Sequence, residues 1–357
     1  MKRGGNDSSG GGARGAYGAK ERRAGGVGDA RGAGSRRSQS ATLRVPDPRR
    51  QREPSTRVML SQVGADLLDG IESYTPKDES DPSVPPAPLT PLLNALDHFK
   101  DKLPHAPQFV TYRNNLNKIL GTPYNTSNAW TLCAEKRDGC VYLDVRRTQD
   151  ELDRNSRPLP QNQADAIYAG RRFELYATEE KFSVDSDHRA RRVSQEEEYC
   201  GLFSLKLAET RLIVAAEIDC YDAHDDRTGN YAYVELKTTR VLKTDKDRYS
   251  FERYKLLSFW IQSFIVGTPR IVCGFRDDQF QLQKLQRFTT TEIPSFCRKH
   301  WDPQVCLGFA DTLLQWVFDT ADEGRVYDVT YRPREHRVEM REQDGGESFL
   351  PPRRAAA

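Results

Sequence analysis

No run of apolar residues in this sequence approaches the roughly 20 that a helix needs to cross a bilayer, so no membrane-spanning helix is predicted. The N-terminal stretch MKRGGNDSSGGGARGAYGAK has basic residues but lacks the apolar segment of a secretory signal. We therefore expect a nuclear or cytoplasmic protein that is not secreted and has no membrane partner.

Paired cysteines and zinc-ligand spacings are also missing. The seven cysteines are an odd number and form no CxxC pair. Several stand in apolar, strand-like runs, which favours reduced, buried thiols over a disulfide framework. The six histidines have no ligand spacing relative to these cysteines. A structural zinc site is therefore not expected.

Large apolar residues are scarce in residues 1–57, which hold 12 of the 25 glycines and carry 14 Lys and Arg against 5 acidic residues. The net charge of this segment is +9, so the rest of the chain carries −7 within a total of +2. Such a segment cannot bury enough surface to fold, and we predict a disordered Gly/Arg-rich basic tail. It either condenses on a phosphate backbone or only solubilises the protein.

Three further segments follow the tail. Residues 58–92 end in the proline-rich stretch PSVPPAPLTP, which no regular element accommodates, so they are predicted to be transitional. Residues 93–335 carry strand and helix patterns and are the expected folded domain. Residues 336–357 are predicted to be a loose polar tail.

Charged residues follow two apolar runs in the stretch 212–240. Glu217 and Asp219 end the first run, and the strand period of two places them on one face. Glu235 and Lys237 end the second run with the same spacing. Because the connector between the runs is rich in turn residues, we predict a hairpin that gathers these four side chains at one end of a sheet.

Three acids against one base on apolar strands are costly without a compensating cation. Mg²⁺ and Mn²⁺ prefer oxygen ligands, and such ions can hold an attacking water while they neutralise a phosphate. Lys237 would then contact the scissile phosphate or orient the water. An acid followed by acid-x-Lys on the next strand is the arrangement of a PD-(D/E)xK-type nuclease. The alternative is a hairpin whose charged side chains face solvent. An acid-x-acid or an acid-x-Lys tripeptide taken alone would favour that alternative.

Three polar residues elsewhere are further candidates. Arg113 stands near the start of a predicted amphipathic helix, residues 108–124, where a surface position is the default. Glu174 lies in the predicted helix of residues 164–178, again with a surface position as the alternative. Gln262 is the lone amide of the apolar run RYKLLSFWIQSFIVG, and a polar group on a buried helix usually has a partner.

The order of these motifs resembles the decapping exonuclease family, DXO and its yeast relatives, over roughly residues 90–335. Five segments carry the resemblance: TYR with KIL shortly after, G-x-x-F-E, E-h-D, E-L-K-T, and W-x-Q-S-F followed by P-R-I-V-x-G-F-R. The resemblance implies an α+β fold in which mixed β-sheets flanked by helices form a PD-(D/E)xK-like core. Residues 93–335 would then be the catalytic decapping-nuclease domain.

The same resemblance implies roles for the candidate residues. One Mg²⁺ or Mn²⁺ would be bound by three carboxylates and one carbonyl, those of Glu174, Asp219, Glu235 and Leu236. Glu217 would help to bind a second ion or position water. Lys237 and Gln262 would contact the reacting phosphate, and Arg113 would bind an RNA phosphate.

The implied reactions are hydrolyses at the 5′ end of RNA: pyrophosphate release from triphosphate ends, removal of incomplete or NAD caps, and in some members 5′-to-3′ exonucleolysis. A separate 5′-to-3′ exoribonuclease is the implied protein partner. The sequence departs from the family at Asn114-Asn115 and Arg171-Arg172, which bear on cap and RNA contacts. Two alternatives remain open, an inactive RNA-binding partner subunit of a nuclease and a DNA-directed nuclease with the same core. The complete set of acids argues against the inactive subunit, and the DNA-directed nuclease stays open as the nearest enzymatic alternative.

Overall fold

The computed structural model describes residues 43–44, 56–58, 63–75, 89–99, 103, 105–146, 159–180, 192–193, 199–222 and 232–352. All of them belong to one compact unit, residues 38–357. Two short strands of the predicted basic tail are described, β1 (Leu43–Arg44) and β2 (Thr56–Val58). Both pair with neighbouring strands, so the predicted disorder does not hold for them. The rest of that prediction lies outside the described residues.

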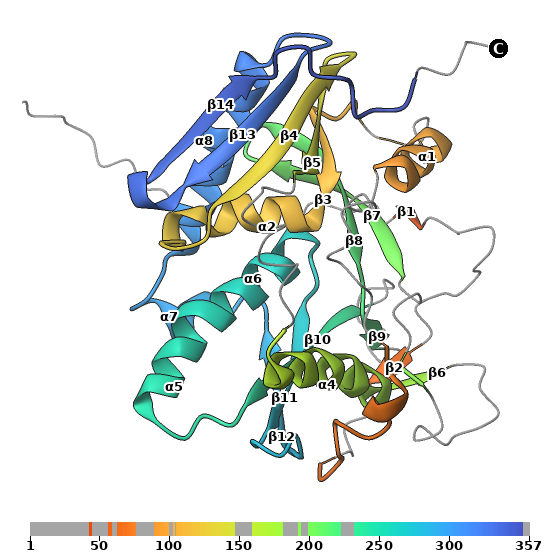
Figure 1. The fold of residues 1–357 in the computed structure, drawn as a ribbon, viewed down its shortest axis with the longest axis vertical. Helices are drawn as coiled ribbons and strands as arrows, with labels where there is room; N and C mark the ends of the chain where they lie inside the picture. Colours follow the sequence, from red (N-terminus) through yellow and green to blue (C-terminus); the bar gives the residue numbers. More distant parts are fainter. Residues whose placement is uncertain are drawn as a thin grey trace, which may run out of the picture. The chain divides into compact units, whose positions relative to one another are not determined.

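An eight-stranded mixed sheet forms the upper part of Figure 1. Its order is β1, β7 (Cys200–Leu207), β8 (Thr210–Glu217), β3 (Phe109–Tyr112), β5 (Cys140–Val145), β4 (Trp130–Arg137), β13 (Val326–Arg332) and β14 (Arg337–Glu342). The central strand β3 runs parallel to β5 and β8. The pairs β4–β5 and β7–β8 are antiparallel.

Helices cover both faces of this sheet because successive side chains of its central strands belong to two different apolar clusters, one on each face. On β8, Ile213 and Ala215 pack against α1 (Thr90–Phe99). Leu212 and Val214 belong to the opposite cluster, with α2 (Arg113–Gly121) and α8 (Pro303–Thr320). A central strand buried on both faces is the arrangement expected when helices cover parallel strands.

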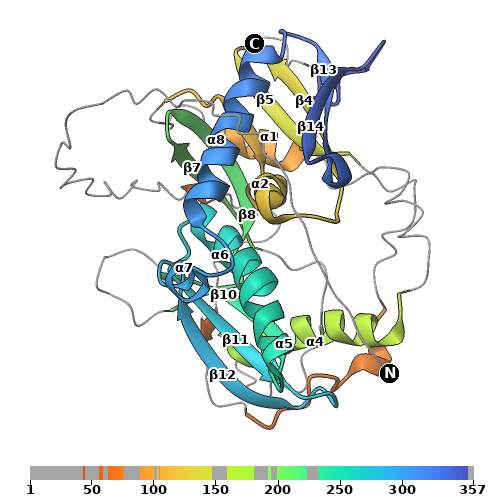
Figure 2. The same ribbon diagram turned by 90° about the vertical axis from the view of Figure 1, so that its left-hand side faces the viewer.

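A six-stranded sheet forms the lower part of the unit, in the order β12 (Leu282–Thr289), β11 (Arg270–Arg276), β10 (Ala232–Arg240), β9 (Cys220–Asp222), β2 and β6 (Thr178–Glu180). The helix α4 (Gln161–Ala177) packs on one face. The other face carries a continuous helical stretch, α5 (Asp245–Ser250), a π-turn (Phe251–Lys255) and α6 (Leu256–Ile265), followed by α7 (Ile293–Cys297) (Figures 1 and 2).

The close approach of α4 depends on a glycine in β11. A Cβ added at Gly274 would lie 2.8 Å from Cε2 of Phe173, which is shorter than real Cβ contacts. A side chain there would push α4 away from the sheet. Gly274 therefore fixes the height of α4 above β10 and β11.

The predicted hairpin of residues 212–240 is only partly confirmed. β9 and β10 do pair in antiparallel register, with Tyr221 opposite Tyr233. The first apolar run, however, belongs to β8 of the other sheet, and the chain passes from one sheet to the other at Ile218 and Asp219. Ile218 still donates its backbone N–H to the Tyr199 carbonyl at 2.9 Å, and Asp219 is the residue at which that ladder stops. The acidic motif thus marks the crossing between two sheets.

Other boundaries also differ from the predictions. Residues 108–124 begin as the strand β3, and α2 starts only at Arg113. The helix predicted from residue 253 is preceded by α5, which begins after Thr244 because that side chain and Asp247 form a capping box.

The segment predicted to be transitional and the tail predicted to be loose are both ordered in part. In the transitional segment, Leu67 is fully buried, and its N–H donates to the Phe280 carbonyl at 3.1 Å. In the predicted polar tail, β14 pairs with β13 along its whole length, and Leu350 is buried. The prediction of a loose tail was therefore wrong for these residues, and part of the transitional segment packs against the folded unit.

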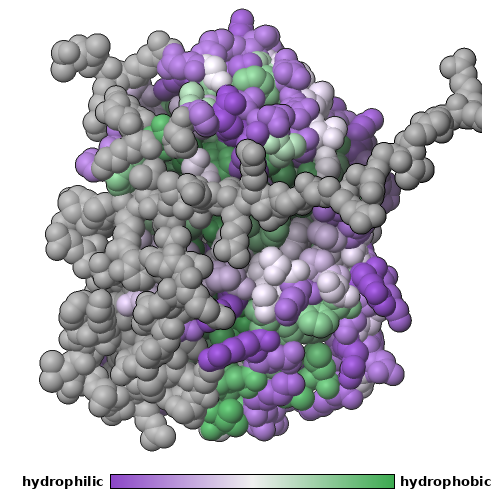
Figure 3. All heavy atoms as spheres, turned by 180° about the vertical axis from the view of Figure 1, so that it is seen from behind, coloured by the Kyte–Doolittle hydropathy of each residue, from purple (hydrophilic) through white to green (hydrophobic). Residues whose placement is uncertain are grey.

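The surface of the unit mixes polar and apolar side chains. Figure 3 shows the side turned away from the viewer in Figure 1, where hydrophobic residues form patches among hydrophilic ones. Among the described helices, none combines the length and the apolar character needed to cross a membrane.

Candidate active site

The candidate site is centred on Glu235 in β10. The strand period places Glu235 and Lys237 on one face, and the Lys237 ammonium lies 2.5 Å from Oε1 of Glu235. Leu236, between them, packs into the apolar cluster with α4. The predicted acid-x-Lys pair is therefore confirmed as a direct contact on a strand whose other face is core.

Two helices add one donor each to the Glu235 carboxylate. The amide of Gln262, on α6, donates to Oε1 at 2.6 Å. Arg113, the first residue of α2, donates from Nη1 to Oε2 at 3.3 Å. Glu235 and Arg113 are 1 % and 4 % exposed, so each buries a charge that the other compensates. The default surface position of Arg113 is thereby excluded.

Asp219 lies beside this group where the chain crosses between the sheets. Its Oδ2 accepts the backbone N–H of Leu236 at 2.6 Å, which holds the carboxylate against β10. Burial raises the pKa of Asp219 well above its usual value, and the negative charges of Glu235, Glu174 and Glu217 raise it further.

Glu174 completes the acidic cluster from the C-terminal half of α4. Burial raises its pKa to about 7, with a further contribution from the charge of Glu217. Glu217, the last residue of β8, is itself exposed to solvent. The four acids predicted from the sequence therefore share one electrostatic environment, although they come from α4, β8, the crossing and β10.

Lys237 remains an ammonium in this environment. Burial alone would lower its pKa, but the charges of Glu235 and Asp219 outweigh burial, so the pKa is raised. A lysine in this state donates hydrogen bonds and positive charge, and does not accept a proton. Its chemistry suits a contact with a phosphate.

The described residues contain no group of three or more His, Cys, Asp or Glu side chains already arranged to hold a metal ion. The donor set nonetheless fits a hard divalent cation, because the ligands are carboxylates whose pKa values are raised by burial and by one another. Arg113 and Lys237 contact Glu235 but leave the pKa values of Glu174 and Asp219 high. A bound cation would have to share the Glu235 carboxylate with the side chains that contact it in this structure.

One contact that positions α4 was not predicted. Arg172, 1 % exposed, donates from Nη2 to Oδ2 of Asp69 at 2.7 Å. The hydroxyls of Tyr176 and Tyr168 donate to the side chain and carbonyl of Asp69 at 2.9 Å and 2.6 Å. The segment 63–75 is thus fastened to the helix that carries Glu174. Arg172 stood out in the sequence as a departure from the family, but nothing there indicated Asp69 as its partner.

We expect Asp69→Asn to lower the free energy of unfolding by about 1–3 kcal/mol, because the buried guanidinium of Arg172 loses its charged partner. Chemical denaturation measures the change. Glu72→Gln is the matched control, since Glu72 is an exposed acid on the same segment. Equal stability of the two variants would show that the Arg172 contact does not hold α4.

Comparisons with known proteins agree with this fold. A family model described as RAI1 like PD-(D/E)XK nuclease matches residues 35–354. The decapping and exoribonuclease protein of Xenopus laevis is 32 % identical over 285 residues, which cover 76 % of this chain and 70 % of that protein.

Two solved structures have the same fold. Rai1 of Scheffersomyces stipitis, in complex with (3′-NADP)⁺ and calcium, superposes with a TM-score of 0.73 at 24 % identity, over 82 % of this chain and 84 % of that one. Rai1 of Candida albicans, in complex with pU5-Mn²⁺, superposes with a TM-score of 0.71 at 24 % identity, over 82 % and 83 %.

Proposed function

The chain belongs to the family of RAI1-like PD-(D/E)XK nucleases, and we propose that it is a divalent-cation-dependent hydrolase that acts on the 5′ ends of RNA. The observation that carries the proposal is the cluster of the half-buried Glu174 and Asp219 with the buried Glu235, which Lys237 contacts. The relatives support it, because one is a decapping and exoribonuclease protein and another binds an RNA together with Mn²⁺.

The cation would be held by the carboxylates of Glu174, Asp219 and Glu235 and by the Leu236 carbonyl, and Glu217 would help with a second ion or with water. When bound, Mg²⁺ or Mn²⁺ supplies a Lewis acid and lowers the pKa of a coordinated water. The backbone N–H of Leu236 orients Asp219 for this role.

The cationic and amide side chains would act on the phosphate. Lys237, kept charged by its acidic neighbours, stabilises the negative charge that develops on the phosphate in the transition state. Arg113 contributes a second fixed charge and a planar set of donors. Gln262 orients Glu235 through one N–H, and the second N–H of its amide is the donor that would reach a phosphate.

The substrates we propose are RNAs with a triphosphate, an incomplete cap or an NAD cap, with 5′-to-3′ exonucleolysis as a further activity. The complex of a related Rai1 with (3′-NADP)⁺ supports a site that accepts dinucleotides. We further propose a nuclear or cytoplasmic location and a 5′-to-3′ exoribonuclease as partner.

A substrate panel tests the proposal. Wild-type protein is incubated with end-labelled triphosphate, guanosine-capped and NAD-capped RNAs and with a DNA of the same sequence, in Mg²⁺, in Mn²⁺ and in a chelator. We expect metal-dependent release of the 5′-end product from at least one RNA and none from DNA. Cleavage of DNA alone would point to a DNA nuclease, and RNA binding without release would point to an inactive partner subunit.

A further inference from the structure

Arg171 on α4 is a cation beside the candidate site to which the proposed function gives no role. It lies three residues before Glu174, and residues three apart lie on one face of a helix. Arg171 is half-buried, whereas its neighbour Arg172 is buried and bonded to Asp69. Within the described part of the chain, Arg171 takes part in no hydrogen bond or ion pair. Its guanidinium is therefore available to a ligand.

The charge of Arg171 reaches the Glu174 carboxylate. Burial raises the pKa of Glu174, and the positive charges of Lys237 and Arg171 oppose that rise. Along the axis of α4 the two residues are about 4.5 Å apart, and an arginine side chain is longer than that. An anionic group that lies against a cation held by Glu174 would therefore be within reach of the Arg171 guanidinium.

Arg113 and Glu174 approach Glu235 from opposite faces of the lower sheet. α4 packs on the face that carries Leu236. Glu235 projects from the other face, where Gln262 and Arg113 donate to it. A phosphate bound at the proposed cation site would therefore have Arg113 on one side and α4 on the other.

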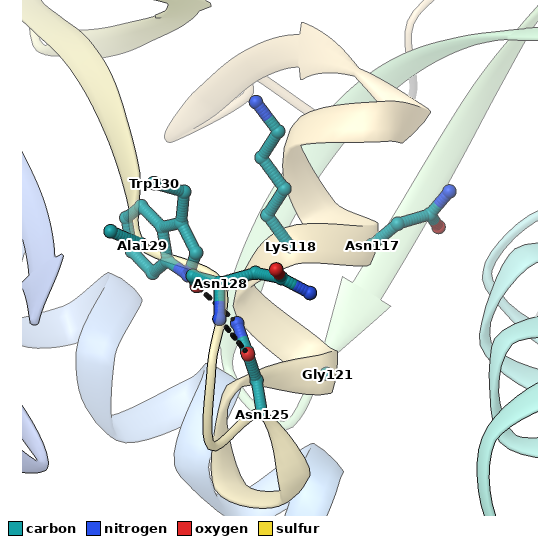
Figure 4. Close-up of a pocket in the computed structure, with 7 residues that line it drawn as sticks. All are labelled: Asn117, Lys118, Gly121, Asn125, Asn128, Ala129 and Trp130. Carbon is teal, nitrogen blue, oxygen red and sulfur yellow. Dashed lines mark hydrogen bonds between the residues drawn. The ribbon is translucent and has the colours of Figure 1, made fainter. Parts of the chain in front are cut away.

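The α2 side has a cavity of about 310 Å³ to which α4 contributes no side chain. Figure 4 shows its wall, which is formed by α2 and by the turn of residues 125–130. A group bound next to Glu174 would instead be contacted by α4 itself. Four residues before Arg171 on the same face of α4 is Ile167, which is 48 % exposed and apolar. On the line of Glu174, Arg171 and Ile167, only Arg171 can donate to a phosphate.

We propose that Arg171 binds the phosphates of the leaving group, and that pyrophosphate release from 5′-triphosphate RNA is the reaction it favours. This inference rests on the proposed function, because it concerns the same site and the same RNA. Water adds to the α-phosphorus, and the bond from that phosphorus to the α,β-bridging oxygen breaks. The RNA keeps a 5′-monophosphate, pyrophosphate leaves with the electron pair, and the protons of the water pass to solvent. Negative charge grows on the bridging oxygen, and the planar guanidinium stabilises it with parallel N–H donors.

Release of intact NAD from an NAD-capped RNA is the internal comparison. That reaction breaks the bond between a phosphorus and a ribose 3′ oxygen. An uncharged sugar then lies where the triphosphate end has its β-phosphate, so Arg171 has less charge to stabilise. A loss confined to the triphosphate RNA would therefore separate a leaving-group contact from general damage to the cation site.

The test measures pyrophosphate release and NAD release from two RNAs of one sequence at saturating Mn²⁺. Arg171→Gln is expected to lower kcat/KM for pyrophosphate release about tenfold or more, and to leave kcat/KM for NAD release within about twofold of wild type. Arg171→Lys keeps a point charge without the planar pair of donors and should recover part of the loss. Arg298→Gln, at an exposed arginine directly after α7, is the matched control and should behave as wild type on both RNAs.

Three results would overturn the inference and leave the proposed function standing: unchanged pyrophosphate release by Arg171→Gln, equal losses on the two RNAs, or a wild type that releases NAD but leaves triphosphate ends intact. If the wild type hydrolyses only the triphosphate RNA, a loss in Arg171→Gln with partial recovery in Arg171→Lys supports the inference, and equal activity of the three proteins overturns it. Hydrolysis of neither RNA, nor of a guanosine-capped one, by the folded wild type would overturn the proposed function itself.

Discussion

Asp219→Asn combined with Glu235→Gln is expected to lower kcat for 5′-end hydrolysis by about a thousandfold or more, at saturating Mn²⁺. The two carboxylates are the proposed cation ligands nearest to Lys237. Asp219→Asn keeps an oxygen that can accept the Leu236 N–H. Glu235→Gln keeps one of the two oxygens that accept from Gln262 and Arg113, and both substitutions remove the negative charge. Because buried Arg113 loses its charged partner, some loss of stability is also expected, and kcat is compared at a temperature at which the variant is folded.

Amides are the right substitutions because alanine would change more than the site. Removing the Glu235 side chain would leave Arg113 buried without its partner, which costs about 3–5 kcal/mol. Single-turnover product release measures the activity, and a thermal melt verifies the fold. Glu209→Gln is the matched control, because the Glu209 side chain is 87 % exposed. Activity of the double variant within about tenfold of wild type would exclude these residues as the catalytic ligands.

Glu174→Gln is expected to stabilise the metal-free protein at pH 8. Burial raises the pKa of Glu174 from 4.5 to about 7. Between these two values the unfolded chain is ionised while the folded chain holds the proton, so the folded state loses stability as the pH rises. A rise of this size corresponds to up to about 3 kcal/mol above pH 7, and to none below pH 4.5. Glutamine carries no charge and removes this contribution.

Denaturant unfolding of wild type and Glu174→Gln at pH 4.5, 6 and 8, with a chelator present, measures the effect. The free energies of unfolding of the two proteins should coincide at pH 4.5 and separate as the pH rises. Because the pKa of Asp219 is also raised, the stability of both proteins still depends on pH. Glu209→Gln is the control, since the Glu209 side chain is 87 % exposed and Glu209 is not one of the acids around Glu174. A difference that is constant with pH would mean that Glu174 is not protonated in the folded state.

The sequence predicted contacts correctly where the alternation of a strand alone determines which side chains are neighbours. The period of two placed Glu235 and Lys237 on one face, and the structure has them in contact. The lone amide Gln262 was expected to have a partner because a buried helix rarely leaves a polar group unbonded, and it donates to Glu235. Each of these inferences uses only the residue pattern of a single strand or a single helix.

Contacts between distant segments were beyond the sequence alone. Arg113 meets Glu235 across 122 positions, and only the family resemblance moved it from the surface to the site. The acids Glu217 and Asp219 looked like the end of one strand, because nothing in an apolar run indicates that the chain leaves one sheet for another. The passage at Ile218 and Asp219 is a property of the packed sheets.

Two ordered segments were missed because their composition resembles that of loops. The edge strand β14 is half exposed, and only two apolar residues, Val338 and Met340, mark its alternation. The segment 63–75 is ordered by a few anchors, the buried Leu67 and the contacts of Asp69 with α4. A few anchors in a short segment do not produce a periodic pattern.

Mn²⁺ binding measured by calorimetry at pH 6.5 tests most directly the claim that the acidic cluster is a cation site. Because Glu174 has a pKa of about 7, binding should release protons, which heats measured in buffers of different ionisation enthalpy would count. We predict saturable binding with proton release by the wild type, less proton release by Glu174→Gln, and no binding by the Asp219→Asn, Glu235→Gln variant. Absence of binding by the wild type, or unchanged binding by the double variant, would contradict the account.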